Sequence, residues 1–192
     1  KDGIAAVLLV VQFVFMIPDI IYVLENTGFD PSWRYFLNVV NGTDLKFGRD
    51  IYFTYGPLGY LFYLMKLPGN TIEYWSGIVI WGIIFLFHLW MLLQLYRLYQ
   101  KGKIHFWAIT ASVCCYLAGY YAPTRDNYLL YLMILAVVLW AKGAKNIVLI
   151  PNLLLLLMFF GKFSTFTSGF AFCILFCIFD VLFRKNWKSI WL

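Results

Sequence analysis

The sequence predicts an all-α, polytopic membrane protein with about six transmembrane helices, and three observations support this class. Of its 192 residues, 63% are hydrophobic and 12% are charged. Soluble domains carry about 25% charged residues, so this chain has too few charges for a surface that faces water throughout. Aromatic residues reach 21%, an excess typical of membrane interfaces. The basic residues lie in short clusters between apolar runs, which indicates orientation in a bilayer rather than nucleic-acid binding.

Long apolar runs predict the individual spans, because a helix needs about 20 such residues to cross the hydrocarbon core. The first run ends near Pro18 and Asp19, where we expect a bent or interfacial last turn. The fourth and fifth runs are short, and flanking polar residues or local bilayer thinning would complete them. The expected spans are residues 3–24, 74–96, 104–121, 128–141, 147–160 and 168–183.

These spans form a single transmembrane domain over residues 1–192, which is either a whole protein or part of a longer one. Its orientation follows from the lysine and arginine clusters, which all fall on one side of the membrane. Cytoplasmic loops carry such an excess, so both termini are expected in the cytoplasm and most acidic residues outside. The clusters are Lys1; Arg97, Lys101 and Lys103; Lys142 and Lys145; and Arg184, Lys185 and Lys188.

The longest expected outer loop covers residues 25–73. Asp30 and Pro31 indicate a helix start, because Asp caps helices and Pro is tolerated in the first turn. Apolar residues then recur at helical spacing, which predicts a short amphipathic helix lying on the outer membrane surface. The apolar face would carry Trp33, Phe36, Leu37 and Val40, and the polar face Arg34, Asn38 and Asn41.

An aromatic segment with Gly56, Pro57 and Leu58 follows, and residues 58–67 are too short to span, so we expect a re-entrant or interfacial helix there. This order of elements resembles the amino-terminal module of the GT-C glycosyltransferases. These enzymes use polyprenyl-phosphate-linked sugars and include protein O-mannosyltransferases and aminoarabinose transferases. In that family an acidic residue, often Asp-Glu, opens the surface helix. Asp30 matches it, although Pro31 stands where Glu is common.

Two later positions extend the resemblance over nearly the whole chain. Arg125 and Asp126 resemble the family's acidic position before the fourth span, in the second outer loop. Gly161 and Lys162 resemble its lysine-containing segment at the outer end of a later span. The resemblance implies transfer of a sugar from a polyprenyl-phosphate donor to an acceptor hydroxyl or amine on the extracytoplasmic side, in a bacterial plasma membrane or its equivalent.

The implied site combines carboxylates with cations. A general base takes the acceptor's proton, or a metal stabilises the departing phosphate, and carboxylates serve either purpose. Asp30 and Asp126 are therefore the expected catalytic residues and the expected ligands of a divalent cation, Mg²⁺ or Mn²⁺. The expected substrate-binding residues are Arg49, Arg125, Lys162 and Tyr55. The three cations among them would neutralise the phosphate.

Several of these residues also have a structural interpretation. Asp30 is a helix cap in that interpretation, and Lys162 reaches toward the membrane interface. Arg125 with Asp126, and Arg49 with Asp50, would be solvated surface pairs. His88, inside the second expected span, is expected to hydrogen-bond a neighbouring helix.

Two other functions fit parts of the pattern. A non-catalytic membrane subunit with the same fold would bind a partner protein in a larger assembly. A small transporter would usually carry charges in mid-membrane or an inverted repeat, and neither is evident in this sequence. The expected partners are thus the lipid bilayer, the lipid-linked sugar and, for the second function, a membrane-protein subunit, with no nucleic acid.

Overall fold

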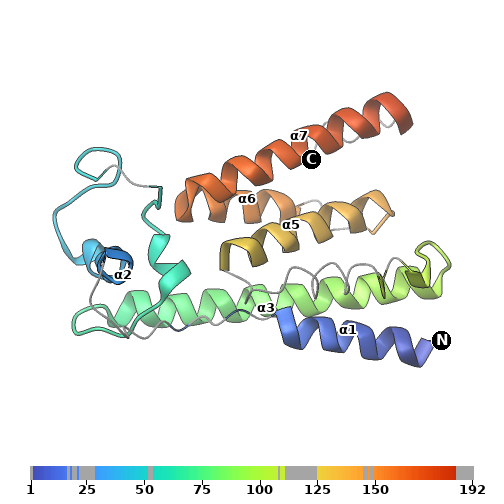
Figure 1. The fold of residues 1–192 in the computed structure, drawn as a ribbon, viewed down its shortest axis with the longest axis horizontal. Coiled ribbons are helices and arrows are strands. Elements are labelled where there is room, and N and C mark those ends of the chain that lie inside the picture. The colour runs from blue at the N-terminus through green and yellow to red at the C-terminus, as the bar shows by residue number, and fades with distance from the viewer. Residues whose placement is uncertain are drawn as a thin grey trace.

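In the computed structural model, the apolar runs form helices that lie side by side, while a shorter helix lies across one end (Figure 1). The part of the chain described comprises residues 2–16, 18, 21, 29–51, 54–107, 109–110, 125–144, 147 and 149–184, and it contains no β-strand. The α-helices are α1 (Asp2–Met16), α2 (Phe29–Val39), α3 (Thr71–Gln100), α5 (Arg125–Ala141), α6 (Leu149–Gly161) and α7 (Phe163–Arg184). Two 3₁₀ helices are η1 (Val40–Gly42) and η2 (Gly59–Tyr63).

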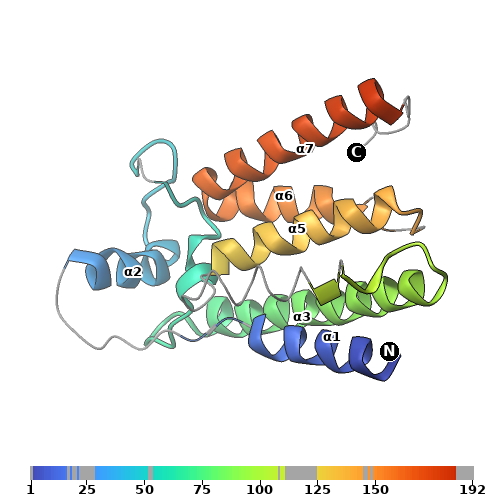
Figure 2. The ribbon, with the colours of Figure 1, turned by 45° about the vertical axis from the view of Figure 1, so that its right-hand side comes forward.

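The two ends of this helix layer differ. In both ribbon views α2, η2 and the loop between them gather at one end, where α5 begins and α6 meets α7 (Figures 1 and 2). At the opposite end α1 begins, α3 and α5 finish, and α7 finishes (Figure 2). The loop region expected outside and the basic turns expected inside therefore lie at opposite ends of the helices.

Helix α5 is the centre of the layer, since it packs against α3, α6 and α7. Its residues are buried on several faces, whereas α3 and α7 leave large apolar side chains exposed. The buried residues of α5 include Leu129, Leu132, Met133, Ala136, Val137 and Leu139. Exposed apolar residues on the flanking helices include Ile72, Leu86, Leu93, Leu175 and Leu182.

Among the described residues, two helices are long and apolar enough to cross a membrane. They are α3, with 30 residues, and the Phe163–Leu182 part of α7, and the mean hydropathy over an 18-residue stretch reaches 2.2 in α3 and 2.0 in α7. Helices α1, α5 and α6 are apolar but shorter. The all-α class is thus confirmed for the described part, and six spans stay a prediction.

Several helix boundaries differ from the expected span boundaries. Helix α1 ends at Met16 rather than near residue 24, because a proline at position 18 lacks an N–H and disfavours helix before it. Ile21 instead bridges Leu64. Helix α5 begins at Arg125, so the pair expected in a loop forms its first turn. The third expected span, 104–121, lies largely outside the described residues.

The sixth expected span also starts too late. Helix α7 begins at Phe163 instead of residue 168. Lys162 alone separates it from α6, because Ser164 and Thr165 continue the helix despite their polarity. A corner with Lys162 at its tip replaces the expected outer loop.

Interhelical hydrogen bonds link the polar residues of the helix layer. The Tyr128 hydroxyl of α5 and His88 Nδ1 of α3 are 2.8 Å apart, which confirms the helix-to-helix contact expected for that histidine. The Gln12 amide of α1 donates to the Tyr131 hydroxyl of α5 over 2.7 Å. Such pairs satisfy polar groups where no water is at hand.

The segment 54–58 pairs with the corner between α6 and α7. The Gly56 N–H donates to the Gly161 carbonyl over 3.0 Å, and the Leu58 N–H donates to the Phe160 carbonyl over 2.9 Å. The Phe163 N–H donates back to the Thr54 carbonyl over 2.8 Å. These bonds satisfy carbonyls that the end of α6 leaves without a helical partner.

Close packing at this corner requires glycine. A Cβ on Gly56 would meet the Phe160 carbonyl oxygen, and a Cβ on Gly161 would meet the ring of Phe62. Gly82, on the exposed face of α3, has nothing within 4 Å of the same position.

Gly161→Ala should therefore lower the free energy of unfolding by about 1–3 kcal/mol, the usual cost of overpacking. Gly82→Ala is the matched control and should be neutral or stabilising by up to about 1 kcal/mol, because alanine favours helix. Thermal unfolding of the purified chain in detergent micelles measures both. Equal midpoints for the two variants would contradict the close approach of Phe62 to Gly161.

Candidate functional site

Asn38 fixes helix α2 to the segment after it. Its side-chain Nδ2 donates to the Tyr63 carbonyl over 2.7 Å, and its Oδ1 accepts from the Met65 N–H over 3.0 Å. Asn38 is only 2% exposed, so the segment after α2 covers the expected polar face at this position. A buried amide is stable here because backbone groups satisfy both of its ends.

The 3₁₀ helix η2 is tied in turn to α3. The Trp81 indole N–H donates to the Leu61 carbonyl over 2.9 Å, and Leu64 packs against Gly77. The expected interfacial helix at 58–67 is thus a single 3₁₀ segment, Gly59–Tyr63, with mostly buried residues. This anchoring gives α2 and η2 a fixed position relative to the long helices.

Three aromatic rings meet where α2, the 54–58 segment and η2 come together. Trp33 stacks on Tyr55 with ring centroids 5.0 Å apart, and it meets Tyr63 edge-on at 4.9 Å. The hydroxyl oxygens of Tyr55 and Tyr63 are 3.5 Å apart. Tyr55 is 5% exposed, whereas the other two rings are half-buried.

Three cations surround these rings. The Arg34 guanidinium lies 4.7 Å from the Tyr63 ring centroid, and the Arg125 guanidinium lies 5.3 Å from the same centroid. The Lys162 ammonium lies 5.1 Å from the Tyr55 centroid. All three cations are half-buried, and all lie within the usual range of cation–π contacts. We call the six residues Trp33, Arg34, Tyr55, Tyr63, Arg125 and Lys162 the aromatic–cationic cluster.

The cluster concentrates positive charge from three separate elements at one end of the helix layer. Guanidinium and ammonium groups are donors only, and they recognise phosphate and carboxylate groups. Partial burial lowers the local dielectric, which strengthens attraction for an anion. The arrangement is therefore chemically suited to hold an anionic head group beside aromatic faces.

Of the four expected substrate-binding residues, the structure brings three together, namely Tyr55, Arg125 and Lys162. The fourth, Arg49, is 66% exposed and forms a 2.7 Å ion pair with Asp50, as its structural interpretation expected. Hydrogen bonds from Arg49 and then from the Lys46 N–H lower the pKa of the Asp50 carboxyl. The hydrogen bonds from Arg49 to the Asp50 carboxylate hold its side chain in this turn, apart from the cluster.

The two expected catalytic residues are close, along the chain, to residues of the cluster. Asp30 is in the first turn of α2, one helical turn before Arg34, and Asp126 follows Arg125 in the first turn of α5. The side chains of both acids lie outside the described residues. Where side chains are described, no three His, Cys, Asp or Glu residues form a metal-binding group. The divalent-cation site at these two acids therefore stays a prediction.

Sequence reasoning missed Trp33, Arg34 and Tyr63 as members of the site. Helical periodicity assigned Arg34 to the polar face of α2 but said nothing of what that face meets. Tyr63 lies in an apolar stretch whose residues look alike in the sequence. The adjacency of Trp33 and Arg34 was the only local signal, and it is too common to single them out.

Tyr63→Leu should loosen both arginines, because it removes the ring face on which they lie. We expect an unfolding midpoint lower than that of Tyr63→Phe, which keeps the face and loses only the hydroxyl. The difference should correspond to about 0.5–2 kcal/mol for each cation. Thermal unfolding in detergent micelles compares the two variants, and equal midpoints would contradict the cation–π contacts.

Comparison with known proteins adds no relative: no protein-family model, no curated protein and no solved structure matches this chain.

Proposed function

We propose that this chain is the transmembrane part of a glycosyltransferase that takes a sugar from a polyprenyl-phosphate donor and transfers it on the extracytoplasmic side. The convergence of Arg34, Arg125 and Lys162 on two tyrosine rings carries the proposal. A phosphate joined to a sugar is an anion with a ring attached, and this cluster offers groups that complement both parts.

The proposed setting is a bilayer crossed about six times, with the cluster at the outer surface. Exposed apolar side chains on α3 and α7 support lipid contact on the outside of the helix layer. Described lysines and arginines at the opposite end, such as Arg97, Lys101 and Lys142, support a cytoplasmic location for that end. A lipid donor would keep its chain in the bilayer while its phosphate reaches the cluster.

In the proposed reaction, the acceptor oxygen or nitrogen forms a bond to the anomeric carbon of the sugar. The bond from that carbon to the phosphate oxygen breaks, and the polyprenyl phosphate leaves with both electrons. Arg125 and Lys162 would neutralise the charge that develops on this phosphate. Asp30 or Asp126 would take the acceptor's proton. A divalent cation held by Asp30 and Asp126 would be a second source of this charge stabilisation.

Donor binding provides a first test. Arg125→Gln and Lys162→Gln should each weaken the affinity of the purified chain for polyprenyl phosphate in micelles by about tenfold or more, because each removes a charged hydrogen-bond donor. Lys66→Gln is the control, since Lys66 is an exposed cation in the loop between η2 and α3. Microscale thermophoresis measures the affinities. An equal loss of affinity in all three variants would mean that net charge alone causes the effect, and it would contradict the proposed site.

Catalysis provides the second test. Asp30→Asn and Asp126→Asn keep the side-chain shape and remove only the negative charge. Whichever of the two residues is the proton acceptor, its substitution should slow sugar transfer by about 10²–10⁴-fold. The same substitution should leave the affinity for polyprenyl phosphate unchanged. Asp44→Asn is the control, because Asp44 is exposed in the same loop. Release of polyprenyl phosphate from lipid-linked hexoses and aminoarabinose reports transfer.

Wild-type rates in both Asp30→Asn and Asp126→Asn would overturn the catalytic assignment. The non-catalytic alternative would be favoured by two results together. The wild-type protein would bind polyprenyl phosphate without transferring sugar, and a second subunit would co-purify with it in a fixed ratio.

A further inference from the structure

A cavity of about 270 Å³ lies between α1, α3 and α5, toward the end of the helices that is opposite the aromatic–cationic cluster. Most of its wall is apolar and includes Leu95 of α3 and Leu135 and Val138 of α5. Lys103 and Lys142 also line it. The proposed glycosyltransferase reaction uses none of these residues.

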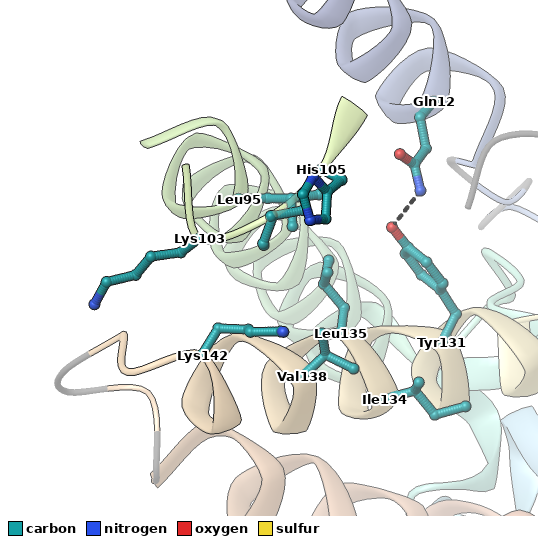
Figure 3. Close-up of a pocket in the computed structure, with 10 residues that line it drawn as sticks. Gln12, Leu95, Lys103, His105, Tyr131, Ile134, Leu135, Val138 and Lys142 are labelled. Carbon is teal, nitrogen blue, oxygen red and sulfur yellow. Dashed lines mark hydrogen bonds between the residues drawn. The ribbon is translucent and has the colours of Figure 1, made fainter. Parts of the chain in front are cut away.

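The polar groups of the cavity divide into two sides. Figure 3 shows Lys103 and Lys142 on one side and the Gln12–Tyr131 hydrogen bond of 2.7 Å on the other. The apolar residues Leu135 and Val138 lie between them (Figure 3). The cavity thus has a cationic side that leads into an apolar interior.

The two lysines come from two different turns that meet at this end. Lys103 follows α3, and Lys142 follows α5. The Lys103 ammonium lies beside the Lys142 turn, 3.6 Å from where a Cβ on Gly143 would stand. None of the described residues that line the cavity is acidic, while Asp2 lines the adjoining open hollow together with His105. Figure 3 shows the Lys142 ammonium pointing toward the apolar residues and the Lys103 ammonium pointing away from them. Both lysines are exposed, and their long flexible side chains can turn toward one anion at this side of the cavity.

We propose that this cavity binds an anionic phospholipid of the leaflet around this end of the helices. The lipid phosphate lies between Lys103 and Lys142, and part of one acyl chain lies along Leu95, Leu135 and Val138. Free phosphate matches the lysines but not the apolar wall, and a neutral lipid matches the wall but not the lysines. Basic pockets between transmembrane helices on the cytoplasmic side are known to hold such head groups. The site goes beyond the proposed function and lies apart from its residues.

Competition between lipids tests the proposal. The purified full chain in detergent is offered equal amounts of phosphatidylglycerol and phosphatidylcholine, and native mass spectrometry measures the ratio of the two that stays bound. Lys103→Gln with Lys142→Gln should lower the preference for phosphatidylglycerol about thirtyfold. Lys101→Gln, an exposed lysine of the same end that does not line the cavity, should leave it unchanged.

An unchanged preference in the double variant, or an equal loss in Lys101→Gln, would overturn the proposal. So would displacement of phosphatidylglycerol by millimolar inorganic phosphate, which would make the site one for the free anion.

A second measurement needs no variant and covers the case in which the double variant fails to fold. Wild-type protein is reconstituted in phosphatidylcholine nanodiscs that contain phosphatidylglycerol with a photoreactive acyl chain. Adducts should concentrate on the peptides that carry Leu95, Leu135 and Val138. Adducts spread evenly over the exposed faces of α3 and α7, or an identical pattern from a photoreactive phosphatidylcholine, would contradict the site.

Discussion

The backbone pairing between segment 54–58 and the corner of α6 and α7 is the constraint on which the candidate site depends. Helix α6 ends with carbonyls that have no helical partner, and a loop supplies their hydrogen bonds. The pairing requires glycine at positions 56 and 161, because the neighbouring chain and the Phe62 ring approach too closely for a side chain. As a result, Tyr55 and Lys162 lie opposite each other in an antiparallel bridge.

From this bridge the remaining contacts follow. Tyr55 stacks on Trp33, so the position of the loop also sets the position of α2. Asn38 holds α2 to the end of η2, which places the Tyr63 ring beside two arginines. Elements far apart in the sequence thus bring their cations to one end of the helix layer. An anionic head group is the ligand class that this charge distribution favours, which is why a lipid-linked phosphate is the substrate proposed.

Local patterns in the sequence predicted the individual helices better than the contacts between them. Helices α3 and α2 were confirmed as helices, because apolar length and helical spacing are local properties. The start of α7 was wrong, because Ser164 and Thr165 are polar yet continue the helix. The burial of Asn38 was not predicted, because its partners are backbone groups 25 and 27 residues away. Arg34 was missed for the same reason, since its ring partner Tyr63 lies in another element.

A disulfide test addresses the pairing of the loop with the corner most directly. Thr54 and Phe163 face each other across the bridge and are exposed, and opposite residues in such a pair lie within disulfide range. In a background without the native cysteines, Thr54→Cys with Phe163→Cys should form a disulfide rapidly under mild oxidation in membranes. Thr54→Cys with Phe170→Cys, two helical turns further along α7, should not. No disulfide in the first pair, or equal rates in both, would contradict the account.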